Sequence, residues 1–226
     1  MVRAVTFDAV ETIIHDTIYP PEQYFAELCR FAGAELSGAS ALEGARARKR
    51  FQEAQRSAES RPVTTDWYRA RHEAGLRAAG LTGNLDPLIE RLRAGVPALR
   101  KGWVLDPDIP AVLDALLEKG VLLAVVSNFD KTLSDLLASL GVARYFRVIT
   151  ASAAVGVAKP DPRIYTCTCD ALGVRPEQCL HVGDSPDNDG GVARAVGARA
   201  VIYDPLDCLH TEYTRVAHLM DVLTVL

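Results

Sequence analysis

The sequence predicts a three-layer α/β fold, in which helices cover both faces of a parallel sheet and a helical segment is inserted after the first strand. Three features predict this fold. Beyond residue 101, short apolar segments alternate with helical ones, which is typical of a parallel sheet. Residues 121–126 are apolar without interruption, as expected of a strand buried on both faces. Residues 16–100 contain helical patterns alone.

The first elements are one strand and the inserted helices. Residues 3–7 form a short apolar segment that predicts a buried strand. The insertion is expected to hold helices at about 21–33, 39–60, 65–80 and 86–100. Gly33 and Gly80 would end two of them, because glycine readily takes the left-handed conformation that closes a helix. We therefore expect a compact helical unit, with arginines such as Arg46, Arg48 and Arg50 on a solvated face.

The remaining elements alternate between helix and strand. The expected helices are 108–120, 130–141, 161–173 and 188–196, and the expected strands are 121–126, 147–150, 180–182 and 198–203. Asp108 and Pro110 suit the start of the first of these helices, since both residue types favour helix N-termini. The predicted core is therefore 1–15 with 101–226, and the predicted helical domain is 16–100.

The composition is that of an ordinary globular protein. Of the 226 residues, 49% are hydrophobic and 24% are charged, which excludes disorder and fibrous repeats. The net charge of -4 offers no basic surface for nucleic acid. No apolar run is long enough for a membrane span and no secretory leader is evident, so we expect a cytoplasmic protein without membrane or nucleic-acid partners. The five scattered cysteines predict reduced thiols rather than disulfides or a zinc site.

Polar residues follow the ends of the predicted strands. In chain order they are Asp8, Ser127, Asn128, Lys159, Asp184 and Asp189. Ligands bind at the carboxyl ends of parallel strands, so these side chains are expected to converge. Carboxylates from two strand ends can hold a hard cation, and the other groups can bind phosphoryl oxygens. An aspartate beside a metal-held phosphate is a plausible nucleophile.

These segments resemble, in order, the four motifs of the haloacid dehalogenase (HAD) superfamily. The matching segments are Phe7-Asp8-Ala9-Val10-Glu11-Thr12, Val125-Val126-Ser127-Asn128, Lys159-Pro160-Asp161-Pro162, and His181-Val182-Gly183-Asp184-Ser185 with Asn188-Asp189. The resemblance covers essentially the whole chain and indicates the branch with a helical cap after the first strand. It implies a Rossmann-like core, a cap over 16–100, and a Mg²⁺-dependent hydrolase of small phosphorylated molecules.

The resemblance implies a metal site built on carboxylates. Asp8 would bind Mg²⁺ as well as act as the nucleophile. Asp184 would be the second carboxylate ligand, and Asp189 would support the ion directly or through water. The backbone carbonyl of Val10 would be a further ligand, which any side chain at that position permits.

It also implies groups that handle the phosphoryl oxygens. Ser127 would hydrogen-bond the transferring group, with Asn128 nearby at the substrate. Lys159 would neutralise the nucleophile and the phosphoryl charge. His181 lies within an apolar strand, which favours a core histidine with satisfied nitrogens over a ligand.

The chain departs from the family's phosphatases at one position. They carry a second aspartate two residues after the nucleophile, where this chain has Val10. Valine cannot transfer protons, and loss of a general acid/base typically costs about 10²–10⁴-fold in rate. Glu11 replaces the usual glycine and is an alternative group for the proton transfer, although on an extended strand its side chain would point to the opposite face.

Three functions therefore remain open. The first is a slow Mg²⁺-dependent phosphatase acting on a small phosphate ester or acyl phosphate through an aspartyl-phosphate at Asp8. The second is a metal-free 2-haloacid dehalogenase, which also lacks the second aspartate. The third is a non-catalytic binding module of the same fold. The additional carboxylates Asp184 and Asp189 favour the first, because a dehalogenase has no need of them around a carboxylate substrate.

Overall fold

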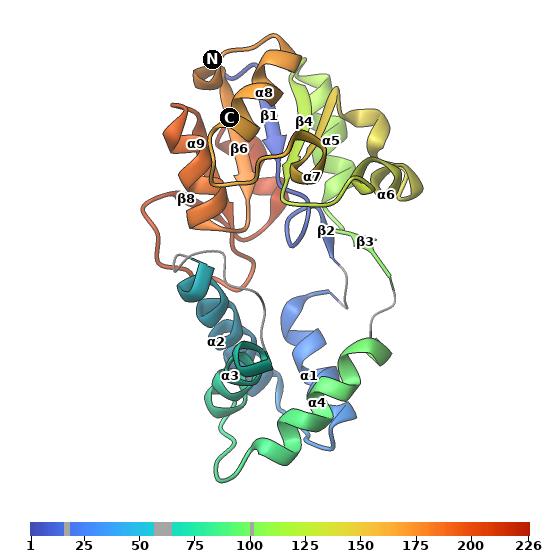
Figure 1. Ribbon diagram of the computed structural model, residues 1–226, viewed down its shortest axis with the longest axis vertical. Helices are drawn as coiled ribbons and strands as arrows, with labels where there is room; N and C mark the ends of the chain where they lie inside the picture. The colour runs from blue at the N-terminus through green and yellow to red at the C-terminus, as the bar shows by residue number, and fades with distance from the viewer. Residues whose placement is uncertain (16–18, 57–64, 100–101) are drawn as a thin grey trace. The chain divides into compact units, whose positions relative to one another are not determined.

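The computed structural model describes residues 1–15, 19–56, 65–99 and 102–226 (Figure 1). The chain divides into two compact units. The core unit comprises Met1–His15, Val104–Pro205 and His210–Leu226. The helical unit comprises Asp16–Trp103 and Leu206–Leu209. Among the described helices, none combines the length and the apolar character that a membrane crossing requires.

The core unit is built on a parallel sheet of six strands in the order β5-β4-β1-β6-β7-β8. The strands are β1 (Ala4–Phe7), β4 (Leu122–Ser127), β5 (Val148–Ala151), β6 (Cys179–Gly183), β7 (Arg199–Tyr203) and β8 (Thr214–Val216). At the end of β1, Phe7 lies opposite Val125 of β4 and Val182 of β6. Three strands therefore end side by side at the middle of the sheet, and the predicted α/β fold is confirmed.

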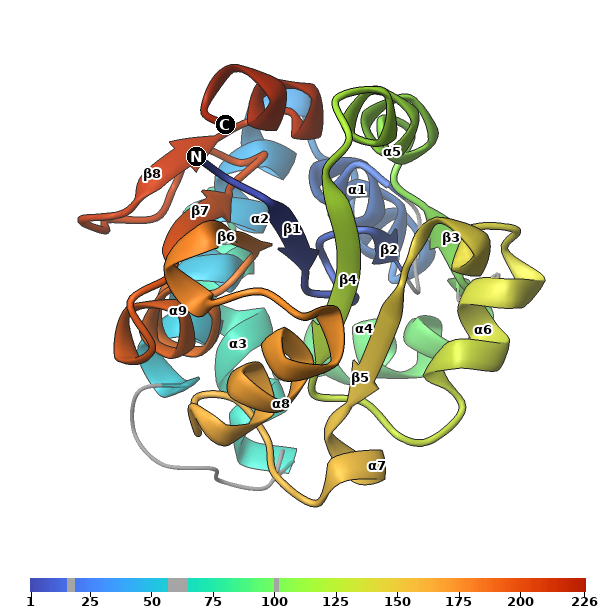
Figure 2. The same ribbon diagram turned by 90° about the horizontal axis from the view of Figure 1, so that it is seen from above.

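Helices cover both faces of this sheet. They are α5 (Ile109–Glu118), α6 (Leu133–Ser139), α7 (Ser152–Val155), α8 (Arg163–Leu172) and α9 (Gly191–Ala195), with 3₁₀ segments at Ala143–Tyr145, Pro176–Gln178 and Leu219–Thr224. Figure 2 shows α5 and the C-terminal 3₁₀ segment on one face, and α8 and α9 on the other. Ala124 and Val126 of β4 pack against Ile164 and Tyr165 of α8, in one continuous apolar cluster. This is the predicted three-layer arrangement.

Among the strands, β8 and one antiparallel pair were not predicted. β8 joins the edge of the sheet, but two of its three residues are exposed and leave no apolar run. A separate antiparallel pair joins β2 (Ile14–His15) to β3 (Val104–Leu105). Strands of two residues are too short to produce a periodic pattern, so their pairing depends on segments that are far apart in the chain.

The helical unit contains α1 (Pro21–Phe31), α2 (Gly38–Arg56), α3 (Thr65–Ala78) and α4 (Asp86–Leu99), and no strand occurs in its described residues. A Cβ atom on Gly75 of α3 would lie 3.0 Å from the carbonyl oxygen of Gly44 of α2, so the two helices pack closely at these glycines. The expected solvated arginine face is wrong for Arg48, which is 5% exposed, whereas Arg50 is exposed. The stem of Arg48 is buried because it lies against Gly75.

Candidate active site

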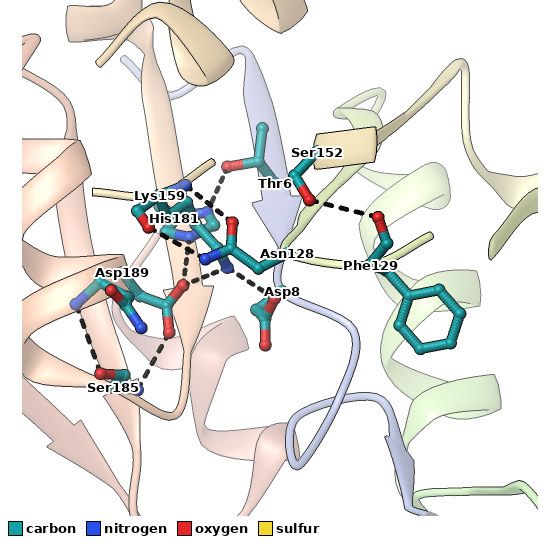
Figure 3. Close-up of polar contacts among 10 residues, drawn as sticks. Thr6, Asp8, Asn128, Phe129, Ser152, Lys159, His181, Ser185 and Asp189 are labelled. Carbon is teal, nitrogen blue, oxygen red and sulfur yellow. Dashed lines mark hydrogen bonds and ion pairs between the residues drawn. The ribbon is translucent and has the colours of Figure 1, made fainter. Parts of the chain in front are cut away.

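The residues that follow the strand ends all lie in the core unit. Asp8 follows β1, Ser127 ends β4 and precedes Asn128, Lys159 lies in the loop before α8, Asp184 follows β6, and Asp189 lies in the π-helical turn Pro186–Gly190. Figure 3 shows Asp8, Asn128, Lys159 and Asp189 gathered beside the end of β1. The neighbouring strand ends explain this convergence.

Lys159 lies between two carboxylates. Its Nζ donates to Oδ1 of Asp8 at 2.5 Å and to Oδ1 of Asp189 at 2.6 Å (Figure 3). The whole residue is only 5% exposed, so this ammonium group is desolvated as well as paired. A cation in this position can offset negative charge both on Asp8 and on a group transferred to it.

The side chain of Asn128 forms two hydrogen bonds with the backbone of Lys159, one as acceptor and one as donor. The amide N–H of Lys159 donates to Oδ1 of Asn128 at 2.7 Å, and Nδ2 of Asn128 donates to the carbonyl of Lys159 at 2.9 Å. The Asn128 side chain therefore fixes the loop that carries the lysine. Ser127 is 1% exposed at the adjacent end of β4.

Three buried carboxylates come together at this point. Asp8, Asp184 and Asp189 each offer an oxygen atom, and these atoms lie within 4.8 Å of one another. Their residues are 6%, 3% and 1% exposed. Lys159 is paired to two of them, Asp8 and Asp189, so the three ionised carboxylates would exceed this one cation in charge. Such a set of oxygen ligands has the chemistry that Mg²⁺ prefers.

The pKa shifts follow from burial and from these neighbours. Burial raises the pKa of Asp8, and repulsion from Asp189 and Asp184 adds to the rise, although Lys159 opposes it. Burial alone would also raise the pKa of Asp189, but Lys159 and the hydrogen bond from His181 hold it below its usual range. Burial acts to lower the pKa of Lys159, yet the attraction of Asp189 and Asp8 raises it. Lys159 and Asp189 thus form a charged pair, and Asp8 is the less stabilised anion.

A series of buried polar side chains, His181, Thr6 and Tyr165, extends from Asp189 into the core unit. Nε2 of His181 lies 3.1 Å from Oδ1 of Asp189, and Nδ1 lies 2.8 Å from Oγ1 of Thr6. Oγ1 of Thr6 is also 2.8 Å from the hydroxyl of Tyr165. Both nitrogens of His181 are therefore satisfied, as its place in an apolar strand predicted. The contributions of Thr6 and Tyr165 were missed, because both positions have the pattern of ordinary core residues.

The segment after Asp8 turns sharply. Val10 is half-buried and forms a bridge with Ile14. Glu11 has a φ of 59°, in the left-handed region, and its N–H donates to the carbonyl of Ile14 at 2.9 Å. The expectation that Glu11 follows the alternation of an extended strand is therefore wrong, because the turn begins at that residue.

A sequence model of a hydrolase family, described as haloacid dehalogenase-like hydrolase, matches residues 2–197. The match spans most of the chain and includes the whole site, from Asp8 to Asp189. The chain therefore belongs to the haloacid dehalogenase-like hydrolases.

Individual relatives agree with this assignment. "Haloacid dehalogenase-like hydrolase domain-containing protein 3" of Bos taurus is 36% identical over 139 residues, which are 60% of this chain and 54% of that protein. "Phosphoserine phosphatase" of Thermus thermophilus is 37% identical over 106 residues, 46% of this chain and 43% of the relative. The chain spans about half the length of these curated relatives.

The solved structure of a HAD phosphatase from Thermococcus onnurineus has the same fold. It superimposes with a TM-score of 0.61 at 24% identity, over 99% of this chain and 97% of the other. This likeness supports the Rossmann-like core with a helical insertion.

Proposed function

We propose that the protein is a Mg²⁺-dependent phosphatase that acts on a small phosphate ester or acyl phosphate through an aspartyl-phosphate at Asp8. The observation that carries this proposal is the position of Lys159 between Asp8 and Asp189, with Asp184 at the same point. The names of related proteins, a phosphoserine phosphatase and phosphoglycolate phosphatases, support a small phosphorylated substrate.

The chemistry follows from the roles of these side chains. A carboxylate oxygen of Asp8 attacks phosphorus, and the bond between phosphorus and the leaving-group oxygen breaks with inversion. Lys159 remains protonated and stabilises the charge on the phosphoryl oxygens, and the hydroxyl of Ser127 hydrogen-bonds one of them. The leaving oxygen takes its proton from solvent, because Val10 has none to give. Water then attacks phosphorus and loses a proton to solvent, and the bond between phosphorus and the Asp8 oxygen breaks. Inorganic phosphate leaves and the carboxylate of Asp8 is restored.

Mg²⁺ would be held by the carboxylates of Asp8 and Asp184 and by the carbonyl of Val10. Bound Mg²⁺ would neutralise charge on the phosphoryl group. Asp189 has a different set of contacts, because Oδ1 faces Lys159 and His181 while Oδ2 accepts the backbone N–H of Ser185 at 2.9 Å. We therefore assign Asp189 chiefly to hold Lys159 in place, with any support of the ion passing through water.

A metal-free dehalogenase remains the second candidate, because Val10 leaves this site without the proton-transferring aspartate of the family's phosphatases. A panel of substrates with Mg²⁺ or EDTA separates the candidates: acetyl phosphate, p-nitrophenyl phosphate, glycerol phosphate and 2-chloropropionate. We expect Mg²⁺-dependent phosphate release, fastest from acetyl phosphate. Metal-independent halide release would instead support the dehalogenase. Binding of phosphorylated ligands without turnover would support the non-catalytic module.

Calorimetry should detect Mg²⁺ binding that depends on Asp184. The substitution Asp184→Asn removes one charged oxygen ligand without changing the size of the side chain, so we expect weaker Mg²⁺ binding and loss of the Mg²⁺-dependent turnover. The matched control is Asp187→Asn, an exposed aspartate in the same loop, which should bind Mg²⁺ as the wild type does. Equal Mg²⁺ affinity and turnover in Asp184→Asn would contradict the metal site.

Substitution of Lys159 should affect both turnover and stability. Lys159 is buried between Asp8 and Asp189, so its removal affects the folded state as well as the chemistry. Lys159→Met leaves buried carboxylates uncompensated, so we expect unfolding free energy to fall by about 3–5 kcal/mol. Turnover should fall by about 10²–10³-fold.

Thermal unfolding and steady-state phosphate release measure these two effects. Mg²⁺ should restore part of the thermal stability of Lys159→Met, because the ion supplies the missing positive charge. Lys131→Met, at an exposed position, is the control and should resemble the wild type in both measurements. Unchanged stability and rate in Lys159→Met would show that the lysine does not serve the carboxylates.

A further inference from the structure

Polar side chains occupy a buried face within the helical unit. On α2, Gly44, Arg48 and Gln52 are spaced by four residues and share one side of the helix, as do Tyr68 and His72 on α3. Arg48 is 5% exposed, Gln52 is 8% exposed and His72 is fully buried. Packed helices normally bury apolar residues on such a face. An arginine and a histidine in this place therefore require a physical explanation.

The described residues hold the stem of Arg48 closely but give its guanidinium no counter-charge. A Cβ on Gly75 would lie 2.6 Å from Cγ and 2.8 Å from Cδ of Arg48, so the glycine makes room for the arginine stem. The guanidinium carbon lies 5.6 Å from the ring centroid of Tyr24 and 5.1 Å from that of Phe25. In the described part of the chain, Nε of Arg48 has no hydrogen-bond partner, and no carboxylate forms an ion pair with this residue.

The charged group that acts most strongly on Arg48 is another cation. Burial, followed by repulsion from Arg71, lowers the pKa of Arg48 to about 10. The guanidinium carbon of Arg71 lies 5.7 Å from the ring centroid of Trp67, and its Nε likewise lacks a hydrogen-bond partner among the described residues. Arg48 and Arg71 therefore repel each other, and no carboxylate of the described residues forms an ion pair with Arg48 to offset that repulsion.

His72 lies on α3 three residues before Gly75, and the same two arginines, Arg48 and Arg71, act on it. Neither Nδ1 nor Nε2 has a hydrogen-bond partner in the described residues, and the ring lies against Tyr68 with centroids 4.3 Å apart. Burial, with repulsion from Arg48 and Arg71, lowers the pKa of His72 to about 2. The ring is therefore neutral near pH 7 and has one N–H group to donate.

The groups without partners among the described residues are Nε of Arg48, Nε of Arg71 and the two ring nitrogens of His72. An oxyanion binds through such cationic groups and N–H donors. A buried cation is costly without a counter-ion, and a buried polar atom without a partner is also unfavourable. An oxyanion beside Arg48 and His72 would supply both the missing charge and the missing acceptors. A planar guanidinium can donate two parallel hydrogen bonds to carboxylate or phosphate oxygens. Nε of Arg48, one of these donors, is buried and has no partner among the described residues.

We propose that the helical unit contains a binding site for a small oxyanion, a carboxylate or phosphate group, held by Arg48, Arg71 and His72. Every residue of the site lies on α2 or α3. The site goes beyond the chemistry proposed for Asp8 and does not depend on it.

Thermal unfolding of wild type and Arg48→Met tests this site. Methionine keeps much of the length and removes the buried charge, so without added anion we expect the variant to be at least as stable as wild type. Malonate or inorganic phosphate is then titrated at constant ionic strength with EDTA present. Near one hundred times Kd, the anion should raise the wild-type Tm by about 5–10 °C and leave that of Arg48→Met unchanged.

The comparison isolates the helical unit, because both proteins keep the same Asp8 cluster and any anion binding there affects them equally. Arg50→Met, at an exposed position on the same helix, should respond like the wild type. Comparison of malonate with phosphate identifies the preferred group. An equal rise in Tm for wild type and Arg48→Met would overturn the proposal, as would a destabilised Arg48→Met protein beside a wild type that does not respond.

A second measurement needs no variant. In wild-type protein, anion titration should shift the imidazole nitrogen resonances of His72 in a saturable manner, whether or not the protein hydrolyses phosphate esters. If neither malonate nor phosphate moves these resonances, the site is refuted.

Discussion

Asp8→Asn should abolish turnover, with a loss on the order of 10⁶-fold, which is typical when the nucleophile of a covalent mechanism is removed. The amide of asparagine cannot form the acyl-phosphate. The variant should nevertheless fold, because the side chain has the same shape and the Lys159 pair with Asp189 remains. It should be at least as stable as wild type, since burial and repulsion already oppose the ionised form of Asp8 and raise its pKa.

Two measurements check this result. Steady-state phosphate release gives the rate, and binding of beryllofluoride, which mimics an aspartyl-phosphate, should occur in wild type but not in Asp8→Asn. The exposed control Asp187→Asn should retain both properties. Undiminished turnover in a folded Asp8→Asn protein would remove the proposed mechanism.

Val10→Asp should accelerate hydrolysis of alkyl phosphates by about 10²-fold, the low end of general acid/base effects. The added carboxyl group would protonate the leaving oxygen and then take a proton from the attacking water. Alkyl oxygens are poor leaving groups and need this proton. p-Nitrophenolate leaves without it, so the first step with p-nitrophenyl phosphate should change little. The measurement is hydrolysis of glycerol phosphate and p-nitrophenyl phosphate in Mg²⁺.

Val10→Asn is the matched control, because its side chain has the size of aspartate but transfers no protons. An equal gain in Val10→Asn, or no gain in a folded Val10→Asp protein that binds Mg²⁺, would show that proton transfer does not limit this enzyme. A dehalogenase or a binding module would not gain phosphatase activity from the substitution.

The turn at Glu11 provides a companion variant to Val10→Asp. The φ of 59° places the backbone of Glu11 in the left-handed region, which costs a non-glycine residue roughly 1–2 kcal/mol. Glu11→Gly should relieve that strain in the double variant, so a larger gain than Val10→Asp alone is the expected result. The same assays measure it.

Local pattern determined most elements of the core and the places of the predicted site residues along the chain. The apolar run at 121–126 and the repeated change between strand and helix were enough to predict a parallel sheet. Ligands bind at the carboxyl ends of parallel strands. The order of elements along the chain was therefore enough to predict that Asp8, Lys159 and Asp184 lie at that end of the sheet. These are properties of short segments and of the order in which they occur.

Only the tertiary structure decided which buried polar groups meet. Thr6 and Tyr165 are 159 residues apart, yet their hydroxyl oxygens lie 2.8 Å from each other. The sequence predicted a solvated Arg48, but α2 and α3 pack closely and its stem lies buried against Gly75. The physical reason is that strand and helix periodicity records whether a position faces the interior. The partner of a buried polar atom depends instead on side chains that distant segments bring to it.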